Sequence, residues 1–108
     1  MDTHTEFGQV VSHIGKDSMV RVWGGLDSMR ASLLSECLED LVATGQRRIT
    51  LDVSELQFAD YTAVAILVGA LTRIRQRGAE AAVLPQSSGA YRVLERTDPA
   101  MARGISID

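Results

Sequence analysis

Alternating apolar and polar residues predict two short strands near the start of the chain. Gln9–Ile14 forms the first, and Ser18–Trp23 alternates more regularly and forms the second. The Gly15–Asp17 segment between them is typical of a tight hairpin turn. The Gly24-Gly25 pair is expected to end the second strand.

Apolar residues then recur at helical spacing in two longer segments. The first segment follows Asp27 and Ser28, which are good N-cap residues, and Gly45 marks its end. Its expected buried face consists of Met29, Leu33, Leu34, Cys37, Leu38, Leu41 and Val42. The second segment follows Asp60 and stops at Gly78. Its expected buried face consists of Ala63, Ile66, Leu67, Ala70, Leu71 and Ile74. Both patterns predict amphipathic helices.

Shorter segments separate and follow these helices. Alternation predicts strands over Ile49–Val53 and Ala81–Leu84, and a short last strand over Gly104–Ile107. Ser87 or Ser88 is expected to cap a third helix. The resulting order, ββαβαβαβ, favours an α/β fold with a mixed sheet of about five strands and helices packed mainly on one face.

Length and composition fit a single domain spanning residues 1–108, with residues 1–8 as a mobile end. Hydrophobic residues make up 45% of the chain, which argues against general disorder. Eleven basic and fourteen acidic residues leave a net charge of −3, which argues against direct nucleic-acid binding and against a membrane partner. No apolar run reaches the roughly 20 residues of a membrane span. The polar start lacks a signal-peptide pattern, so we expect a cytoplasmic protein.

The residues that carry most enzyme chemistry form no familiar pattern. His4 and His13 belong to no Ser/His/Asp or Cys/His arrangement. Metal ligands are not clustered, and Gly24-Gly25 fits neither a Walker motif nor a dinucleotide fingerprint. The lone Cys37 has no disulfide partner, and a buried structural thiol is favoured over a nucleophile. We therefore expect no enzyme activity, no catalytic residue, no metal and no cofactor.

Three arginines stand near the end of the second predicted helix. Arg73, Arg75 and Arg77 carry the positive charge that complements a helix C-terminus. Their alternate spacing does not place all three on one helix face. A solvated helix end is favoured here over an anion site.

An acid, a phenol and a hydroxyl stand in a row where the second helix begins. With Asp60 as the N-cap, Thr62 lies in the first turn, where backbone N–H groups have no helical partner. Its hydroxyl can stay exposed while Ala63 faces the core. One interpretation is a structural helix cap. The other is a phosphorylation switch. A phosphoryl group adds about −1.5 to −2 charges, which the helix dipole tolerates but which would repel a partner docked on this surface.

At these residues the chain resembles the STAS domain family, the fold of bacterial anti-sigma factor antagonists. Gly24-Gly25-Leu26-Asp27 is similar to the family's Gly-Glu-Leu-Asp-like turn before the first helix. The segment ITLDVSELQFAD looks like the strand that follows, and Asp60-Tyr61-Thr62-Ala63 resembles an Asp-Ser-Ser-Gly-like helix start. RQRGAEAAVLPQSSGAYRVLERT is similar to the fourth strand and third helix of the family. The resemblance covers almost the whole chain.

The resemblance implies a protein that is bound and modified by others. In the antagonist branch, an anti-sigma factor with protein kinase activity phosphorylates the second Ser of the motif, and a phosphatase reverses the reaction. Thr62 occupies that position. The partner-binding residues implied are Gly25, Asp27, Asp60, Tyr61, Thr62 and Ala63.

Two departures from the motif keep an alternative open. Tyr61 replaces the first Ser, and Ala63 replaces the Gly. Some STAS modules are subunits of transporters or signalling scaffolds, and threonine occurs at the Thr62 position among them. The alternative is therefore a non-phosphorylated scaffold or transporter accessory subunit that binds a different protein or a small ligand.

Overall fold

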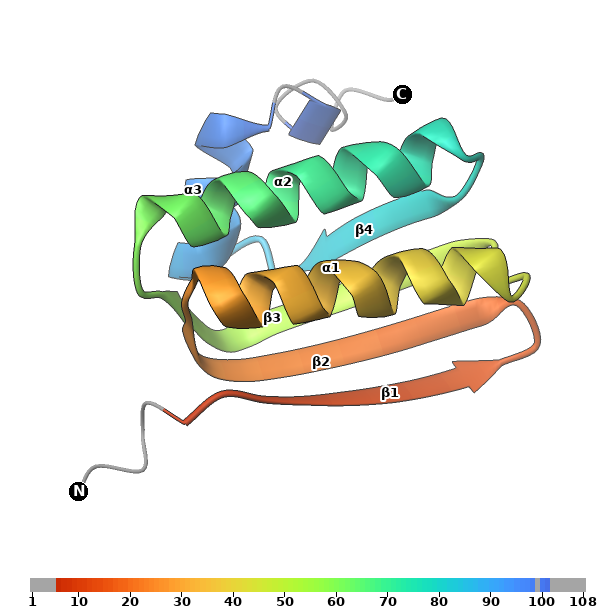
Figure 1. Cartoon of the computed structure of the whole chain (residues 1–108), viewed down its shortest axis with the longest axis horizontal. Coiled ribbons are helices and arrows are strands. Elements are labelled where there is room, and N and C mark those ends of the chain that lie inside the picture. Colours follow the sequence, from red (N-terminus) through yellow and green to blue (C-terminus); the bar gives the residue numbers. More distant parts are fainter. Residues whose placement is uncertain (1–5, 99, 102–108) are drawn as a thin grey trace.

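Four strands and three helices make up the described part of the protein, in a computed structural model that describes residues 6–98 and 100–101 (Figure 1). The elements in chain order are β1 (Gly8–Ile14), β2 (Asp17–Leu26), α1 (Ser28–Ala43), β3 (Arg48–Phe58), α2 (Tyr61–Gln76), β4 (Glu80–Leu84) and α3 (Gly89–Thr97). The observed order is ββαβαβα, so the prediction of about five strands is not matched within the described residues. The predicted strand Gly104–Ile107 lies outside them.

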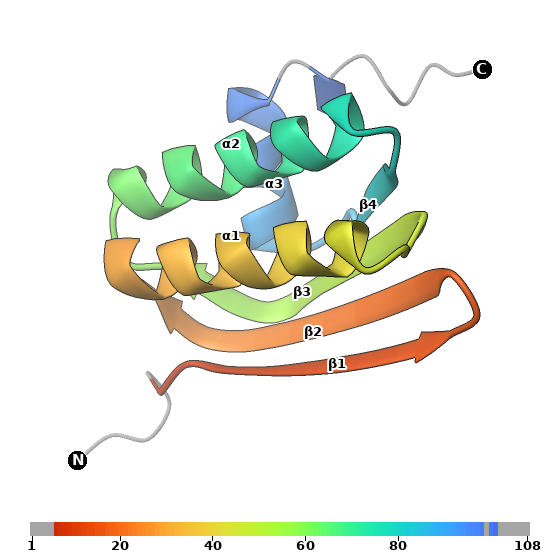
Figure 2. The same ribbon diagram turned by 45° about the vertical axis from the view of Figure 1, so that its right-hand side comes forward.

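The sheet is mixed, as predicted, with the strand order β1-β2-β3-β4. β1 runs antiparallel to β2, whereas β2 runs parallel to β3 and β3 runs parallel to β4. α1 and α2 lie side by side over one face of the sheet, and α3 packs against α2 and β3 (Figures 1 and 2). Because both parallel crossovers run through helices, the starts of α1 and α2 fall at the same end of the molecule.

Both central strands are longer than predicted. β2 continues through Gly24-Gly25 to Leu26, so the pair does not end the strand. Gly24 has φ 87°, and a β-carbon there would collide with the carbonyl oxygen of Glu6. Glycine therefore lets the incoming chain approach the strand closely. β3 continues beyond Val53, because its pairing with β2 resumes after a shift in register and ends at Phe58.

The two long helices begin at the predicted caps, but α1 buries a different face. Buried residues of α1 are Ala31, Leu34, Ser35 and Leu38. Met29 is 71% exposed and Leu33 is 57% exposed, so their assignment to the core is wrong. At about 100° per residue, both point away from the side that carries Ala31 and Leu38. The predicted face of α2 is confirmed, except that Ile66 is only partly buried.

Two of the three arginines near the end of α2 are paired with acids. Arg73 contacts Glu39 on α1 at 2.9 Å, and Arg75 contacts Asp98 at 2.9 Å. Asp98 is buried, and the Arg75 side chain is mostly covered. The interpretation of a solvated helix end is therefore wrong for Arg75, which ties α2 to the segment after α3.

Candidate functional site

The start of α2 presents two exposed side chains above a fixed helical turn. Asp60 has an extended backbone, and its Oδ1 accepts the backbone N–H of Ala63 at 2.8 Å. Ala63 is fully buried, so this bond holds the first turn against the core. Tyr61 is 69% exposed, and Thr62 is also exposed. The predicted cap is confirmed, and the Thr62 side chain is accessible to solvent.

The connection between β2 and α1 lies directly beside this turn. The backbone N–H of Ala59 donates to the carbonyl oxygen of Leu26 at 2.9 Å, because parallel β2 and β3 end next to each other. A hollow of ≈ 430 Å³ opens there, lined by Glu6, Gly25, Asp27, Arg30, Gln57, Phe58 and Ala59. The structure thus brings Gly25 and Asp27 next to the α2 start. Tyr61 and Thr62 do not line this hollow.

Charge is balanced on the α1 side of the site and unbalanced on the α2 side. Asp27 caps α1 by accepting the backbone N–H of Arg30 at 2.9 Å, and it also accepts the Arg30 guanidinium at 2.7 Å. The backbone N–H of Arg30 is the main cause that lowers the pKa of Asp27, so this carboxylate is ionised at neutral pH. Asp60 forms no ion pair with any residue of the described segments. The Asp60 carboxyl group at the start of α2 therefore has no paired cation among these residues.

Exposed apolar residues extend from this site along α1. Met29 lies in the first turn of α1 and Leu33 lies one turn further, both on its outer side. Tyr61 adds an exposed aromatic side chain at the start of α2. The starts of α1 and α2 lie at the same end of the molecule (Figures 1 and 2). The sequence pattern placed Met29 and Leu33 in the core, so it did not predict them as surface residues. The spacing of Ala31 and Leu38 defines a different apolar face of α1, and a helix that buries this face leaves Met29 and Leu33 outside the core.

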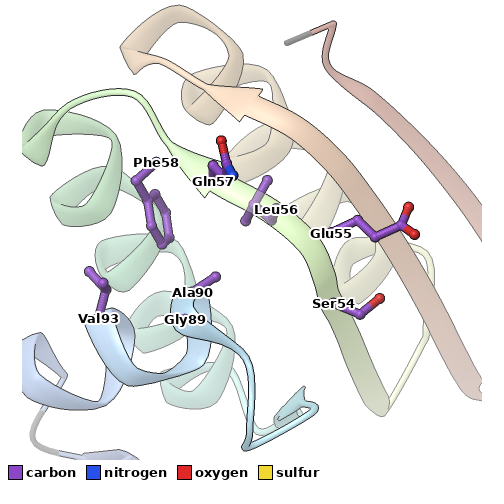
Figure 3. Close-up of a pocket in the computed structure, with 8 residues that line it drawn as sticks. All are labelled: Ser54, Glu55, Leu56, Gln57, Phe58, Gly89, Ala90 and Val93. Atoms are coloured by element: carbon purple, nitrogen blue, oxygen red, sulfur yellow. The ribbon is translucent and has the colours of Figure 1, made fainter. Parts of the chain in front are cut away.

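A second hollow, of ≈ 560 Å³, lies on the other side of the β3 end (Figure 3). β4 pairs with β3 only from Arg48 to Asp52, so the later part of β3 has no strand on that side. Ser54–Phe58 and three residues of α3 line the hollow, and the Phe58 ring points from β3 towards Val93. Gln57 and Phe58 line both hollows. The segment that leads into α2 therefore stands between two depressions.

The described residues contain neither a metal site nor a membrane-spanning helix. Across residues 6–98 and 100–101, no group of three or more His, Cys, Asp or Glu side chains could hold a metal ion. Within the same ranges, none of the helices has the length and apolar character needed to cross a membrane.

Burial is the main cause that raises the pKa of the half-buried Cys37 thiol, which lowers its thiolate fraction.

Residues 10–98 match the family model described as "Mlab, STAS domain". The chain therefore belongs to the STAS domain family. No curated protein sequence matches it.

Solved structures share this fold. The phosphorylated form of the Bacillus cell fate determinant SpoIIAA superimposes with a TM-score of 0.67 at 14% identity, covering 88% of this chain and 86% of that one. The STAS domain of an antisigma-factor antagonist from Rhodobacter sphaeroides has a TM-score of 0.53 at 26% identity, covering 72% of this chain and 85% of that one.

Some similar structures are much longer proteins. The murine Solute Carrier 26 family member A9 anion transporter matches with a TM-score of 0.58 at 14% identity over 79% of this chain, which spans 14% of that chain. The chain likewise spans only 20% of the structure of Mglu. The fold of this chain therefore occurs both in small proteins and as part of much longer chains.

Proposed function

We propose that this protein is a cytoplasmic anti-sigma factor antagonist that docks through the start of α2 and is switched off by phosphorylation of Thr62. Its partners are an anti-sigma factor with protein kinase activity and a phosphatase that reverses the modification. The protein acts by binding and is a substrate, with no catalytic role of its own. The observation that carries the proposal is the exposed residue Thr62 in the first turn of a capped helix, beside exposed Tyr61.

The geometry supports a switch that acts on binding and leaves the fold intact. Thr62 is exposed, while the next residue, Ala63, is buried and hydrogen-bonded to Asp60. A phosphoryl group on Thr62 would project into solvent, near backbone N–H groups that favour negative charge. A partner packed against Tyr61, Met29 and Leu33 would have to bury that dianion. The desolvation cost of an unpaired charge then weakens the complex.

The first experiment tests phosphorylation. The protein is incubated with ATP in lysate from its own organism, and its intact mass is compared with that of Thr62→Ala and Thr72→Ala. Thr72 is an exposed threonine of the same helix, so Thr72→Ala is the matched control. We expect one added phosphoryl group in the wild type and in Thr72→Ala, and none in Thr62→Ala. Equal modification of Thr62→Ala refutes the assignment of the switch residue.

The second experiment tests binding to the anti-sigma factor recovered with the wild-type protein. Thr62→Glu is expected to bind at least about tenfold more weakly, which corresponds to about 1.4 kcal/mol. Its urea unfolding midpoint is expected to match that of the wild type, because the side chain is exposed. Unchanged affinity of Thr62→Glu contradicts the switch.

A second candidate function is a constitutive scaffold or transporter accessory subunit. The observation that favours it is the bulky Tyr61 beside Thr62, since this aromatic side chain is 69% exposed and stands where the antagonist motif has a small residue. Under this alternative, the protein binds its partner equally well whether residue 62 is threonine or glutamate. Tyr61→Ala is then expected to weaken binding more than Thr62→Glu does.

A further inference from the structure

Three cationic side chains surround one hollow at the end of the molecule opposite the α2 start. Lys16 comes from the β1–β2 turn, Arg47 from the α1–β3 connection and Arg77 from the end of α2. The hollow measures ≈ 320 Å³, and its other lining residues are uncharged: Val42, Ala43, Gly45, Gln46 and Ala79. These segments all lie at the right-hand end of both ribbon views (Figures 1 and 2). We call this feature the basic hollow.

Hydrogen bonds hold the segments of the basic hollow together. The backbone N–H of Arg47 donates to the carbonyl oxygen of Lys16 at 2.8 Å. The Gln46 side chain donates to the carbonyl oxygen of Gly15 at 3.0 Å and accepts the Ser18 hydroxyl at 2.6 Å. The Arg47 guanidinium also lies beside Gly78, directly after Arg77. The backbone positions that carry the three cations are therefore set by the fold.

The three cations of the basic hollow form no ion pair with the acids of the described residues, although Glu39, which pairs with Arg73, is close enough to interact with the charge of Arg77. The arginines that do have acidic partners are Arg21, Arg30, Arg48, Arg73 and Arg75. Lys16, Arg47 and Arg77 form no ion pair with any described residue. The lining residues carry three positive charges, which the C-termini of α1 and α2 offset by about −0.5 each, so the lining keeps a net positive charge. This local positive charge stands in a chain whose net charge is −3.

We propose that the basic hollow binds a phosphate group, carried either by a small soluble ligand or by a lipid headgroup. Two guanidinium groups offer planar pairs of N–H donors for phosphate oxygens, and the lysine adds a point charge. The volume of the hollow lies at the lower end of the range for ligand sites, which suits one or two phosphoryl groups. α1 and α2 each span 16 residues, which separates this site from the α2 start by roughly 24 Å. A ligand there leaves the proposed docking surface open.

The test uses isotope-labelled full-length protein titrated with pyrophosphate at constant ionic strength and followed by amide chemical shifts. We expect saturable shifts at Lys16, Arg47 and Gly78. The Arg47→Gln/Arg77→Gln double variant is expected to bind at least tenfold more weakly. The matched control is Arg92→Gln/Arg96→Gln, which also removes two cations. These two arginines line a different hollow, together with Glu95, and neither forms an ion pair with a described residue. It is expected to bind like the wild type.

A second arm distinguishes the two sources of phosphate. Vesicles of phosphatidylcholine with phosphatidic acid are sedimented with each variant, and vesicles of phosphatidylcholine alone serve as the blank. Sedimentation that depends on Arg47 and Arg77 assigns a lipid headgroup, whereas saturable pyrophosphate binding alone assigns a soluble ligand.

The proposal is overturned if neither probe binds the wild type above the salt control, or if the control variant loses as much binding as the Arg47/Arg77 variant. The amide spectrum of each variant verifies that it is folded, so lost binding is not confused with unfolding. Binding to the protein partner is expected to be unchanged in all of these variants. The outcome is therefore independent of the proposed switch at Thr62.

Discussion

Replacing Asp60 separates its structural role from its proposed contact with a partner. Asp60→Ala removes the 2.8 Å hydrogen bond to the Ala63 N–H, and losing such a cap costs about 1 kcal/mol. It also removes a negative charge from a helix N-terminus, which costs a further ~0.5 kcal/mol. Asp60→Asn keeps a side-chain oxygen that can cap the helix and loses only the charge. We therefore expect about 1.5 kcal/mol of destabilisation for alanine and about 0.5 kcal/mol for asparagine.

Urea unfolding measures this difference. With a slope of about 1.5 kcal/mol per molar urea, the midpoint of Asp60→Ala falls by ~1 M and that of Asp60→Asn by about a third as much. Asp40→Ala is the control, because Asp40 is an exposed acid in the last turn of α1 and caps no helix N-terminus, and its replacement is expected to change stability by less than about 0.5 kcal/mol.

Two outcomes would contradict this account of Asp60. If alanine and asparagine destabilise equally, the side-chain oxygen contributes nothing and the cap is not what holds the turn. If both variants match Asp40→Ala, the turn is held by the burial of Ala63 alone. Partner affinity measured on the same proteins tests the second role. A folded Asp60→Asn that binds like the wild type shows that the Asp60 charge makes no contact with the partner.

Two further predictions follow from burial. Leu33 is 57% exposed, so Leu33→Asp is expected to keep the free energy of unfolding within about 0.5 kcal/mol of the wild-type value and to weaken partner binding at least tenfold. Leu34 is buried, so Leu34→Ala is expected to lower the free energy of unfolding by about 2–5 kcal/mol in a urea titration. A loss of stability in Leu33→Asp as large as that of Leu34→Ala would refute the outward position of Leu33. Burial raises the pKa of the Cys37 thiol above its ordinary value, so a thiol reagent is expected to react slowly at pH 8, faster as the pH rises, and faster again in urea. Reaction at pH 8 at the rate of an unfolded cysteine would show that the thiol is not shielded.

The local elements of this protein could be predicted from the sequence because their signals are local. Asp27, Asp60 and Ser88 each accept a backbone N–H three residues ahead, and this depends only on the residue type and its place before an apolar period. The glycines that follow α1 and α2 have positive φ, as expected where a helix ends. The exposed hydroxyl of Thr62 follows from the same reasoning, since the buried period of α2 begins at the next residue.

Tertiary structure decided the features that depend on distant segments. The apolar residues of α1 allow two different buried faces, and packing against the sheet and α2 selected the one with Leu34 and Leu38, leaving Met29 and Leu33 in solvent. β2 continues through Gly24 and Gly25 because both residues pair with β3, a segment about 30 residues away in the chain.

The same limit applies to the two candidate sites. The Ala59–Leu26 hydrogen bond brings the two connections together because β2 and β3 run parallel and end in register. Lys16, Arg47 and Arg77 are separated by about 30 residues each along the chain, and only the topology of the sheet and helices places them around one hollow. The sequence by itself determined the chemistry of each residue and the local backbone around it. The physical reason that it could not assemble the sites is that their proximity arises from strand pairing and helix packing between segments far apart in the chain.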